Sequence, residues 1–575
     1  MSHDRTMEWL IQSQDKEKTR ELASALGSHE LLAWVLLNRG LQDPAECEAF
    51  LSPTLDQLSP GDEWPADMEK AVDRIARSLD KGDTIGVHGD YDADGVTATA
   101  LISLFLRSVG AKSVWHLPHR RKEGYGMRPS GVDILVEKGA GLIITVDCGI
   151  SDFEAIQHAE KLGIDVIVVD HHQLPDKMPP AYAVINHNRL DCPFQKEHLS
   201  GAGLAFYLAA AVRAKLRDSG AVPESELPNM LSMLDLAALG TVADVVPLLG
   251  RNRVITRFGL EQLNRGGRPG IMQLRRVAGL LKRPVSAGSI AFQLAPRINA
   301  AGRMDSGDPA LRMLMAADER RAGEYADELE KMNRTRQEVE ERILEEALAQ
   351  VERIGDPADL PITIAAGEDW HIGVIGIVAS RLVEKYYRPA LVIGMTDGVG
   401  KGSLRSVTGI NIYEALAECA DLLDAFGGHP MAAGITVREE NLAAFSEKLS
   451  LAVGERAVGA PAGPVLKVDA EWPVNRWEKD LVKQFARLKP HGIGNPEPAF
   501  CARGVRVKWA RTARKDTLVM EVSEGGTDIR AVGFRMAHLL PRADDRVDIV
   551  YVPEIDNWEG RDEVRLRIKD LKVVA

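Results

Sequence analysis

Residues 87–95, VHGDYDADG, place one histidine and three aspartates close together in the chain. Carboxylates at this spacing repel one another, so a folded protein must protonate some of them, expose them to water or bind a cation between them. Imidazole and carboxylate groups are ligands of divalent metal ions such as Mn²⁺ and Mg²⁺. The segment therefore predicts a metal site, provided that further ligands reach it from other parts of the chain.

Further candidate ligands follow short apolar runs. Asp147 follows GLIITV, His171 comes shortly after DVIVV, and Asp244 lies in LGTVADVVPL. From about residue 84 to 187 such runs alternate with helical patterns, which predicts an α/β fold with a parallel sheet and helices on its faces. Functional loops of parallel sheets gather at the carboxyl ends of the strands. We therefore expect these side chains to meet at one edge of the sheet.

The number and type of these ligands indicate which metal is bound and what it does. An EF-hand calcium loop is excluded, because its twelfth position is Leu101 and a strand precedes it. So many ligands suit two ions that share a carboxylate, about 3.5 to 4 Å apart. Mn²⁺ is expected and Mg²⁺ is an alternative, whereas zinc is disfavoured without thiolates. Such ions activate water for in-line attack on phosphorus, so phosphoester or phosphoanhydride hydrolysis is predicted. The ligands expected from position are His88, Asp92, Asp94, Asp147 and His171, with Asp244 as a candidate to complete the set.

Composition limits the class of protein. A chain of 575 residues with 45% hydrophobic residues is expected to form three or four globular domains. No apolar run is long enough for a membrane span and the first residues lack a secretory signal, so a cytoplasmic protein is expected. The five cysteines are scattered, which predicts neither disulfides nor a zinc knuckle. The net charge of -13 argues against a polyanionic partner for the molecule as a whole. A multidomain protein can nevertheless carry a basic groove.

Changes in sequence pattern divide the chain. Charged helical periodicity predicts a long connecting helix, and the β-rich end, with some five alternating runs, predicts a small barrel of the OB type. The predicted segments are a helical 1–70, a catalytic 71–318, a connecting helix 319–352, a second α/β domain 353–464 and the barrel 465–575.

Four stretches together resemble the successive motifs of the DHH phosphoesterase superfamily, which is named for the triplet at residues 170–172. These stretches are VHGDYDADG, TVDCG, VVDHH and GTVADVVPL. Five more are similar to bacterial exonucleases of this superfamily that act on single strands: PHRRKEGYGM, APRINAAGRM, GKGSLRS, GGHPMAAG and HGIGNPEPAF. The resemblance covers roughly residues 80–575. Leu404 and His491 depart from it in small ways that affect local contacts only.

The resemblance implies roles for individual residues. It implies a DHH catalytic domain, a DHH-associated second domain across a cleft, and two metal ions bridged by Asp147. Asp90 would be an alternative ligand or a support for one, and His172 would face the scissile phosphate. The predicted catalytic residues are Asp147, His172 and Arg297, the last by gripping a neighbouring phosphate.

Basic and glycine-rich segments are candidates for binding nucleic acid. Arginine forks suit phosphate oxygens and glycines allow close approach of the backbone. The loop at 118–128 is a predicted phosphate clamp, with an ordinary solvated loop as the alternative. GKGSLRS and GGHPMAAG are predicted glycine-punctuated phosphate loops, with structural turns as the alternative. In the barrel, Trp509 is a candidate stacking platform and a packed tryptophan is the alternative. The candidate contacts are Arg120, Arg121, Lys122, Tyr125, Arg297, Asn299, Arg303, Ser403, Arg405, Ser406 and His429.

The function predicted is that of a metal-dependent exonuclease that degrades single-stranded DNA and releases mononucleotides. The resemblance implies 5′ to 3′ polarity and a setting in recombination and repair, with single-strand-binding protein and a RecQ-type helicase as partners. A monomer is expected. Two alternatives stay open: a phosphohydrolase of short oligonucleotides or cyclic dinucleotides, and a catalytically inactive scaffold that binds single strands.

Overall fold

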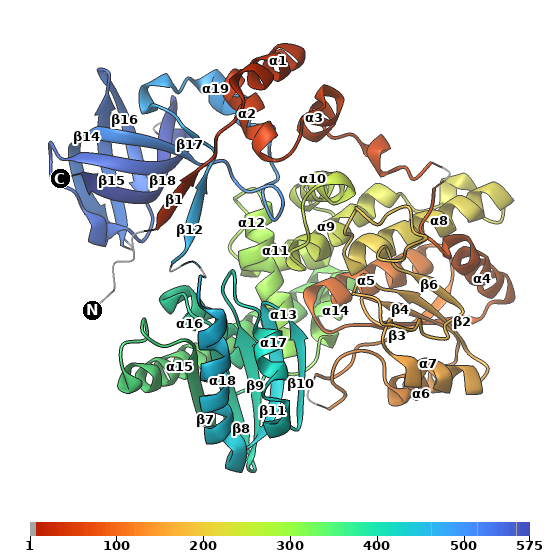
Figure 1. Cartoon of the computed structure of the whole chain (residues 1–575). Helices are drawn as coiled ribbons and strands as arrows, with labels where there is room; N and C mark the ends of the chain where they lie inside the picture. The colour runs from red at the N-terminus through yellow and green to blue at the C-terminus, as the bar shows by residue number, and fades with distance from the viewer. Residues whose placement is uncertain are drawn as a thin grey trace. The chain divides into compact units, whose positions relative to one another are not determined.

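The computed structural model shows two compact units (Figure 1). The smaller contains Lys331–Leu466 with the chain up to Leu10, and the larger contains Ile11–Glu330 and the chain from Lys467 onward. None of the helices in the described part combines the length and apolarity needed to cross a membrane. The described residues are 7–61, 63–120, 122–459, 461, 463–514, 516–558 and 561–574.

A five-stranded parallel sheet forms the centre of the first α/β domain, as predicted. Its strand order is β3-β2-β4-β5-β6. The strands are buried and apolar because helices cover both faces: α6 and α7 lie on one face, and α4, α5 and α8 on the other (Figure 1). The elements are α4 (Met68–Lys81), β2 (Thr84–Gly89), α5 (Ala93–Ser108), β3 (Lys112–His116), α6 (Pro129–Glu137), β4 (Ala140–Val146), α7 (Phe153–Lys161), β5 (Asp165–Val169), β6 (Ala183–Ile185) and α8 (Gly201–Ser219).

Further helices complete this domain, and three of them, α9, α13 and α14, pack against α5. A π-helical turn, Ile290–Leu294, leads directly into α13, and π-helical turns are frequent at functional sites. Helix α13 contacts α5, the helix that begins at the aspartate-rich motif. The helices are α9 (Leu234–Ala243), α10 (Gly250–Arg265), α11 (Pro269–Val277), α12 (Ala287–Ser289), α13 (Ala295–Met304) and α14 (Asp308–Met315).

The long helix α15, Glu319–Ile354, confirms the predicted connecting helix and leads into the second α/β domain. This domain has a mixed sheet of order β10-β11-β9-β8-β7, in which only β7 and β8 are parallel neighbours. Its elements are β7 (Thr363–Glu368), α16 (Ile375–Tyr386), β8 (Ala390–Thr396), β9 (Val399–Arg405), α17 (Ile412–Ala417), β10 (Ala425–His429), β11 (Ala432–Arg438) and α18 (Leu442–Arg456).

One local prediction in this domain is wrong. GKGSLRS was predicted as a phosphate loop, but residues 400–405 form the central strand β9 between β8 and β11. The glycines there serve packing, because a Cβ on Gly400 would lie 2.7 Å from Met395 Sδ and one on Gly402 would lie 2.6 Å from Ile435 Cγ1. Glycine in this segment therefore marks tight packing inside a sheet and not a turn.

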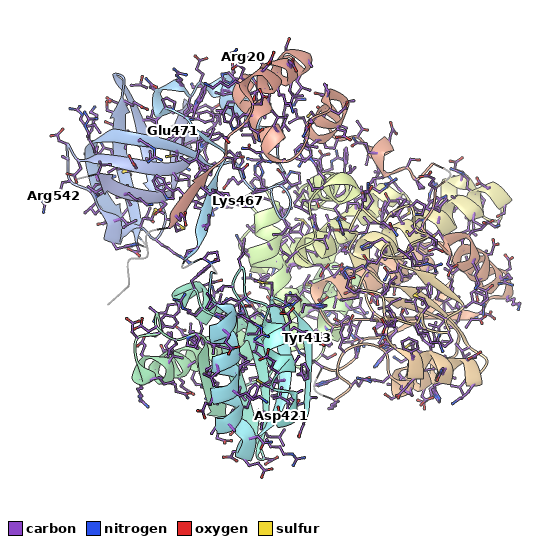
Figure 2. All side chains as sticks on the ribbon, viewed as in Figure 1. Arg20, Tyr413, Asp421, Lys467, Glu471 and Arg542 are labelled. Atoms are coloured by element: carbon purple, nitrogen blue, oxygen red, sulfur yellow. The ribbon has the colours of Figure 1, made fainter. Side chains whose placement is uncertain are left out.

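The C-terminal strands close into the predicted barrel. The order is β13-β14-β15-β16-β18-β17, and β14 also pairs with β17, which closes the cylinder. Charged side chains such as Glu471 and Arg542 lie on its exposed surface (Figure 2). The elements are β12 (Val465–Val468), β13 (Ala470–Glu471), α19 (Lys479–Ala486), β14 (Phe500–Ala513), β15 (Thr517–Glu524), β16 (Thr527–Gly533), β17 (Arg546–Trp558) and β18 (Arg561–Val574).

The N-terminal helices share a hydrophobic core with this barrel, a contact that the sequence did not indicate. Leu32 and Leu36 of α2 belong to the same buried cluster as Phe500 and Tyr551. Trp34 Nε1 also donates to the carbonyl of Asp469, at 2.8 Å. The elements before α4 are β1 (Glu8–Ile11), which pairs with β12, and helices α1 (Lys16–Leu26), α2 (Glu30–Asn38) and α3 (Pro44–Leu51).

Arg253 of α10 ties the catalytic domain to the segment that leads into the barrel. Its buried guanidinium donates to the carbonyls of Phe50, Leu488 and Lys489 at 2.8, 3.0 and 3.0 Å. Its centre also lies 3.8 Å from the ring centroid of Phe50. Burying a charge is costly unless every donor is satisfied. The carbonyls fulfil this condition and fix the course of residues 487–490.

Candidate metal centre

The candidate ligands lie where three neighbouring strands and one helix end. Asp90 and Asp92 follow β2, Asp147 follows β4, and His171 follows β5. Asp244 is the C-cap residue that follows α9. Since β2, β4 and β5 are parallel neighbours, their carboxyl ends lie at one edge of the sheet. The fold thus collects side chains that are far apart in the sequence.

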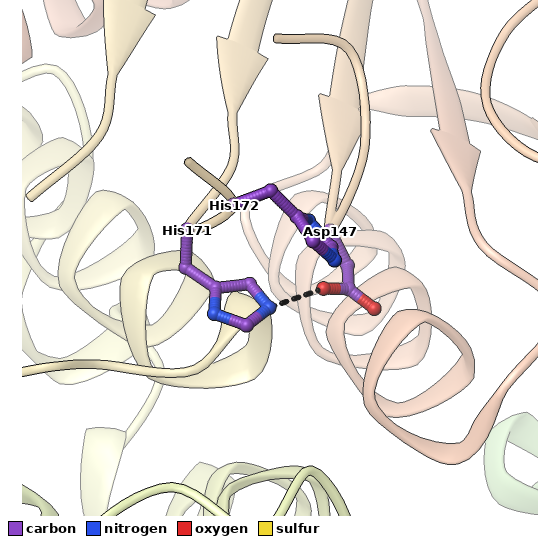
Figure 3. A group of neighbouring side chains, drawn as sticks. All are labelled: Asp147, His171 and His172. Atoms are coloured by element: carbon purple, nitrogen blue, oxygen red, sulfur yellow. Dashed lines mark ion pairs between the residues drawn. The ribbon is translucent and has the colours of Figure 1, made fainter. Parts of the chain in front are cut away.

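His171 lies at the centre of this cluster. Its Nε2 is 3.0 Å from Asp147 Oδ1, 3.6 Å from Asp244 Oδ2 and 4.0 Å from Asp94 Oδ2. Figure 3 shows the first of these contacts together with the imidazole of His172. The candidate ligand atoms form three sets, each within 4.8 Å: Asp147 with His171 and His172, Asp94 with His171 and Asp244, and Asp90 with Asp92 and Asp147.

Several of these ligand atoms are unsatisfied. Among the described residues, five predicted ligand atoms are buried without a hydrogen-bond partner: His88 Nε2, Asp90 Oδ1, Asp147 Oδ1, His171 Nε2 and Asp244 Oδ2. The contacts of His171 Nε2 given above are ion-pair distances and not hydrogen bonds. Buried polar atoms are normally paired, because an unpaired one costs about 1 to 3 kcal/mol. Oxygen and imidazole atoms that converge in this way are what a divalent cation satisfies. The residues present therefore fit a metal site.

Burial and mutual repulsion raise the pKa values of the acids. Burial raises the pKa of Asp94 to about 7, with Asp92 as the next cause. It raises the pKa of Asp244 to about 8, with Asp94 as the next cause. The pKa values of Asp90 and Asp147 also rise well above the ordinary range, again through burial first. Without metal, several of the acids therefore hold protons at neutral pH, so protons and a cation compete for the site.

The scaffold anchors Asp94 and leaves room for its neighbours. Its two carboxylate oxygens accept the backbone N–H groups of Gly201 and Ala202 at 2.7 and 3.0 Å, at the positive N-terminal end of α8. A Cβ on Gly201 would lie 2.6 Å from Asp147 Cβ, and one on Gly240 would lie 2.3 Å from Asp94 Oδ1. These glycines are functional positions that the sequence analysis did not identify, because each packs closely against a residue that is distant in the sequence.

His88 is the one predicted ligand that the structure does not group with the others. Its ring is buried, Nδ1 lies 3.6 Å from Cys148 Sγ, and Nε2 points to the space beside Gly131, where a Cβ would lie 3.1 Å away. Burial also lowers the pKa of His88 to about 3. Asp90 takes part in a ligand set and His88 in none of those formed by the described residues. Its Nε2 is nevertheless buried without a hydrogen-bond partner, as are the four other ligand atoms named above, and metal binding by His88 stays a prediction.

Asp170 holds the other histidine of the triplet. Its Oδ1 accepts from His172 Nδ1 at 2.7 Å, and its Oδ2 accepts from the backbone N–H of Ile150 at 3.0 Å. Burial lowers the pKa of His172, but the hydrogen bond and charge of Asp170 outweigh it and raise this pKa to about 9. His172 is therefore held as a cation beside the ligand cluster.

The predicted clamp loop is attached close to this cluster. His116 Nε2 lies 2.8 Å from Glu123 Oε2, and the hydroxyl of Tyr125 donates to the carbonyl of Asp147 at 3.3 Å. Arg120 lies over the ring of Tyr91, 5.2 Å from its centroid. Lys122 is exposed, and Arg121 lies outside the described residues. DNA binding by this loop stays a prediction.

Arg297 and Asn299 already make structural contacts. The guanidinium of Arg297 donates to Glu330 Oε2 at 2.8 Å and to the carbonyl of Gln293 at 2.6 Å. Asn299 Oδ1 accepts the backbone N–H of Ala93 at 2.7 Å and so supports the aspartate-rich loop from α13. Arg303 lies in the same helix. The predicted catalytic role of Arg297 and the phosphate contacts of all three remain predictions.

The candidate nucleic-acid contacts in the second α/β domain differ in their exposure. Ser403 and Arg405 project from β9 next to α16, with Arg405 Nη1 donating to Ser403 Oγ at 3.0 Å. His429 is exposed at the end of β10. Ser406, by contrast, is buried and donates to the carbonyl of Ile410 at 2.7 Å. The serine hydroxyl of residue 406 is thus occupied internally, and the binding roles of the others stay predictions.

Comparison with known protein families agrees with the fold and site. Residues 84–241 match the DHH family, N-terminal domain, residues 359–455 match the DHHA1 domain, and residues 468–570 match the RecJ OB domain. A parallel-sheet DHH domain with a cluster of acidic and imidazole ligands defines a metal-dependent phosphoesterase.

Similarity to individual proteins extends over nearly the whole chain. The single-stranded-DNA-specific exonuclease RecJ of Bacillus subtilis is 35% identical, over 99% of this chain and 71% of that protein. The RecJ exonuclease of Escherichia coli is 36% identical over 98% of both. The crystal structure of Thermus thermophilus RecJ with Mn²⁺ has a TM-score of 0.82 at 31% identity, covering 99% of this chain and 80% of that one. A structure of the same protein with Mg²⁺ has a TM-score of 0.76. The chain belongs to the RecJ family.

The raised pKa of Asp244 predicts how pH affects the metal-free protein. A carboxyl whose pKa is about 8 when folded and 3.8 in its ordinary state favours folding below pH 4 and loses that contribution as the pH rises to 8. We expect Asp244→Asn, without metal, to unfold at a higher temperature than the parent at pH 8.5, and the gain to shrink at pH 5. Thermal unfolding in the presence of a chelator measures this difference in unfolding temperature at each pH. An equal gain in unfolding temperature at both pH values would contradict the raised pKa of Asp244.

The close packing of Gly240 predicts a second outcome. A methyl group at residue 240 would meet Asp94 Oδ1 and Thr97 Oγ1, so Gly240→Ala should destabilise the protein by about 1 to 3 kcal/mol. Gly323→Ala in α15 is the matched control, because its Cβ would make only ordinary contacts and alanine favours helix by about 1 kcal/mol. Denaturant unfolding compares them. If Gly240→Ala leaves the free energy of unfolding unchanged, the site can accommodate a methyl group and the packing argument is contradicted.

Proposed function

We propose that this protein is a metal-dependent exonuclease that degrades single-stranded DNA from the 5′ end and releases mononucleotides. The observation that carries the proposal is the convergence of buried, unpaired carboxylate and imidazole atoms at the sheet edge of a RecJ-family chain. The RecJ exonuclease of Escherichia coli matches 98% of this chain, and residues 468–570 match the RecJ OB domain. A catalytically inactive scaffold would have no use for such a costly cluster.

We propose that the site holds two divalent ions, with Mn²⁺ the first choice and Mg²⁺ the alternative. Structures of a relative contain each of these metals. Asp147 belongs to two of the three ligand sets, which supports it as the shared ligand. When bound, such ions supply an acidified water and positive charge for the phosphoryl oxygens.

The protein's own residues would position the substrate for this chemistry. The His172 side chain is 43% exposed, so its imidazolium can reach a phosphoryl oxygen beside the ligand cluster. Asp92 accepts the N–H groups of Asp94 and Gly95 at 2.9 and 3.0 Å, which fixes the start of α5. Arg120 and Lys122 lie on the loop anchored next to the site and would bind neighbouring phosphates.

An extended strand is favoured over a small substrate by features away from the metal site. The larger unit contains a cavity of about 940 Å³ lined by Arg257, Lys489 and Phe292 among others. Phe292 is 82% exposed and lies on the π-helical turn seven residues before Asn299, about 10 Å along the helix. An exposed aromatic ring beside cations suits the stacked bases and phosphates of single strands.

The biological setting follows from this activity. We propose a role in DNA recombination and repair, with single-stranded DNA as substrate and single-strand-binding protein and a RecQ-type helicase as protein partners. A cytoplasmic monomer is part of the same proposal. The described cysteines are all unpaired thiols, as expected in a reducing compartment.

Removal of Asp147 tests the proposed chemistry. With Mn²⁺ and a 5′-labelled single strand, the parent should release labelled mononucleotide at once and leave blunt duplex intact. Asp147→Asn should lower this rate by roughly 10² to 10³-fold, because metal stabilisation is worth several kcal/mol. Asp133→Asn, an exposed acid paired with His158, is the control and should be unchanged. Release of long labelled fragments, or full activity of Asp147→Asn, would contradict the proposal.

Phe292 tests whether long strands are the substrate. We expect Phe292→Ala to raise KM for a strand of 30 nucleotides by roughly 5- to 100-fold, since one base stack is worth about 1 to 3 kcal/mol. Hydrolysis of a dinucleotide should change less, because a longer strand offers this ring more bases to stack on. Leu281→Ala is the control, because Leu281 is also an exposed apolar residue but has no aromatic ring. A parent that hydrolyses the dinucleotide faster than the strand would favour the small-substrate phosphohydrolase.

A further inference from the structure

Asp170 is buried and its carboxylate is fixed by three hydrogen bonds. Oδ1 accepts from His172 Nδ1 at 2.7 Å and from the backbone N–H of His172 at 3.1 Å. Oδ2 accepts from the backbone N–H of Ile150 at 3.0 Å. The side chain is 1% exposed. Because both oxygens are engaged, Asp170 cannot turn away from the imidazole without losing a second bond.

The imidazole of His172 is held between this carboxylate and Tyr125. The Tyr125 hydroxyl lies 3.1 Å from His172 Nδ1 and 3.4 Å from Nε2, and the two rings meet edge to face at 5.6 Å. The His172 side chain is nevertheless 43% exposed. One side of the ring is therefore fixed inside the protein and the other faces outward.

Asp170 has no place in the candidate metal sets. One of those sets contains Asp147 with both histidines of the triplet, His171 and His172, but Asp170 is in none of them. A buried carboxylate beside a metal site that is not among the candidate ligands needs another reason for being held in place by three hydrogen bonds. Its contacts supply one, since the only side chain in its hydrogen bonds described above is the imidazole of His172.

We propose that Asp170 is a positioning residue that acts through His172. By accepting the hydrogen of Nδ1 it makes Nε2 the ring atom that faces the substrate phosphate, since the bond made by one ring nitrogen decides the role of the other. The inference rests on the proposed function, because it assigns His172 to the substrate of that reaction.

Asp170→Asn tests the inference, because an amide has a single oxygen. If the amide NH₂ faces His172, Nδ1 must become an acceptor and the ring proton moves to Nε2. If it faces Ile150, two donors oppose each other. The change is isosteric, so a loss of activity reports the altered hydrogen bond and not a new cavity.

We expect Asp170→Asn to lower kcat on single-stranded DNA by roughly 10² to 10⁴-fold, the range for a misdirected catalytic imidazole. KM for the strand and the Kd for Mn²⁺, measured by calorimetry, should change by less than about threefold. A loss of Mn²⁺ affinity as large as the loss of kcat would overturn the inference. It would show that Asp170 acts through Ile150 on the loop that carries Asp147.

A double-mutant cycle supplies the decisive readout. In the His172→Ala background, Asp170→Asn should lower kcat no further, because the two residues act as one unit. An equal loss in both backgrounds would overturn the inference. Asp133→Asn is the control: this exposed acid pairs with His158 at 2.7 Å and should leave kcat unchanged in both backgrounds. Asp170→Ser serves the same cycle if the asparagine variant does not fold.

A spectroscopic measurement separates this inference from the proposed function. In the ¹⁵N spectrum of histidine-labelled protein, the His172 signals should show Nδ1 bearing hydrogen in the parent, and Asp170→Asn should shift them. Unchanged His172 signals would overturn the positioning role even if the nuclease is active. Absence of nuclease activity in the parent, with the expected shift in Asp170→Asn, would instead overturn the proposed function alone.

Discussion

Repulsion among buried carboxylates is the constraint on which the rest of this structure depends. Asp90, Asp94 and Asp147 are buried and Asp244 is partly buried, and burial raises the pKa of each. Such a cluster persists only if protons or cations neutralise it. The fold therefore stores unfavourable electrostatic energy that divalent metal binding recovers, and this exchange links folding, pH and metal affinity in one site.

Backbone strain and closely packed glycines around the ligands also help to hold this arrangement. Asp147 has a φ of 61° and Val245, next to Asp244, has a φ of 62°, both in the left-handed region that residues with a side chain avoid. Each such residue costs about 1 to 3 kcal/mol. Gly201 and Gly240 remove the side chains that would otherwise collide with Asp147 and Asp94. Strained backbone and missing side chains thus gather around the ligands, where the geometry must be exact enough for coordination.

The sequence predicts the architecture and most of the ligand cluster, but not the details that depend on side-chain direction. Alternating apolar runs predict the parallel sheet, and strand ends predict where Asp147 and His171 meet. Asp90 joins a ligand set, whereas the His88 ring lies beside Cys148 and Gly131 and joins none formed by the described residues, a side-chain direction that strand ends do not predict. The glycines of GKGSLRS indicated a loop, because the sequence of this segment alone does not show their close contacts with the neighbouring strands.

The central claim is that protons and divalent cations substitute for each other in this cluster. Calorimetric titration of the metal-free protein with Mn²⁺ at pH 7, repeated in buffers of different ionisation enthalpy, counts the protons released. Because the pKa of Asp94 is about 7 and that of Asp244 about 8, the account predicts net release of roughly one proton or more. Tight binding of Mn²⁺ without proton release would contradict it.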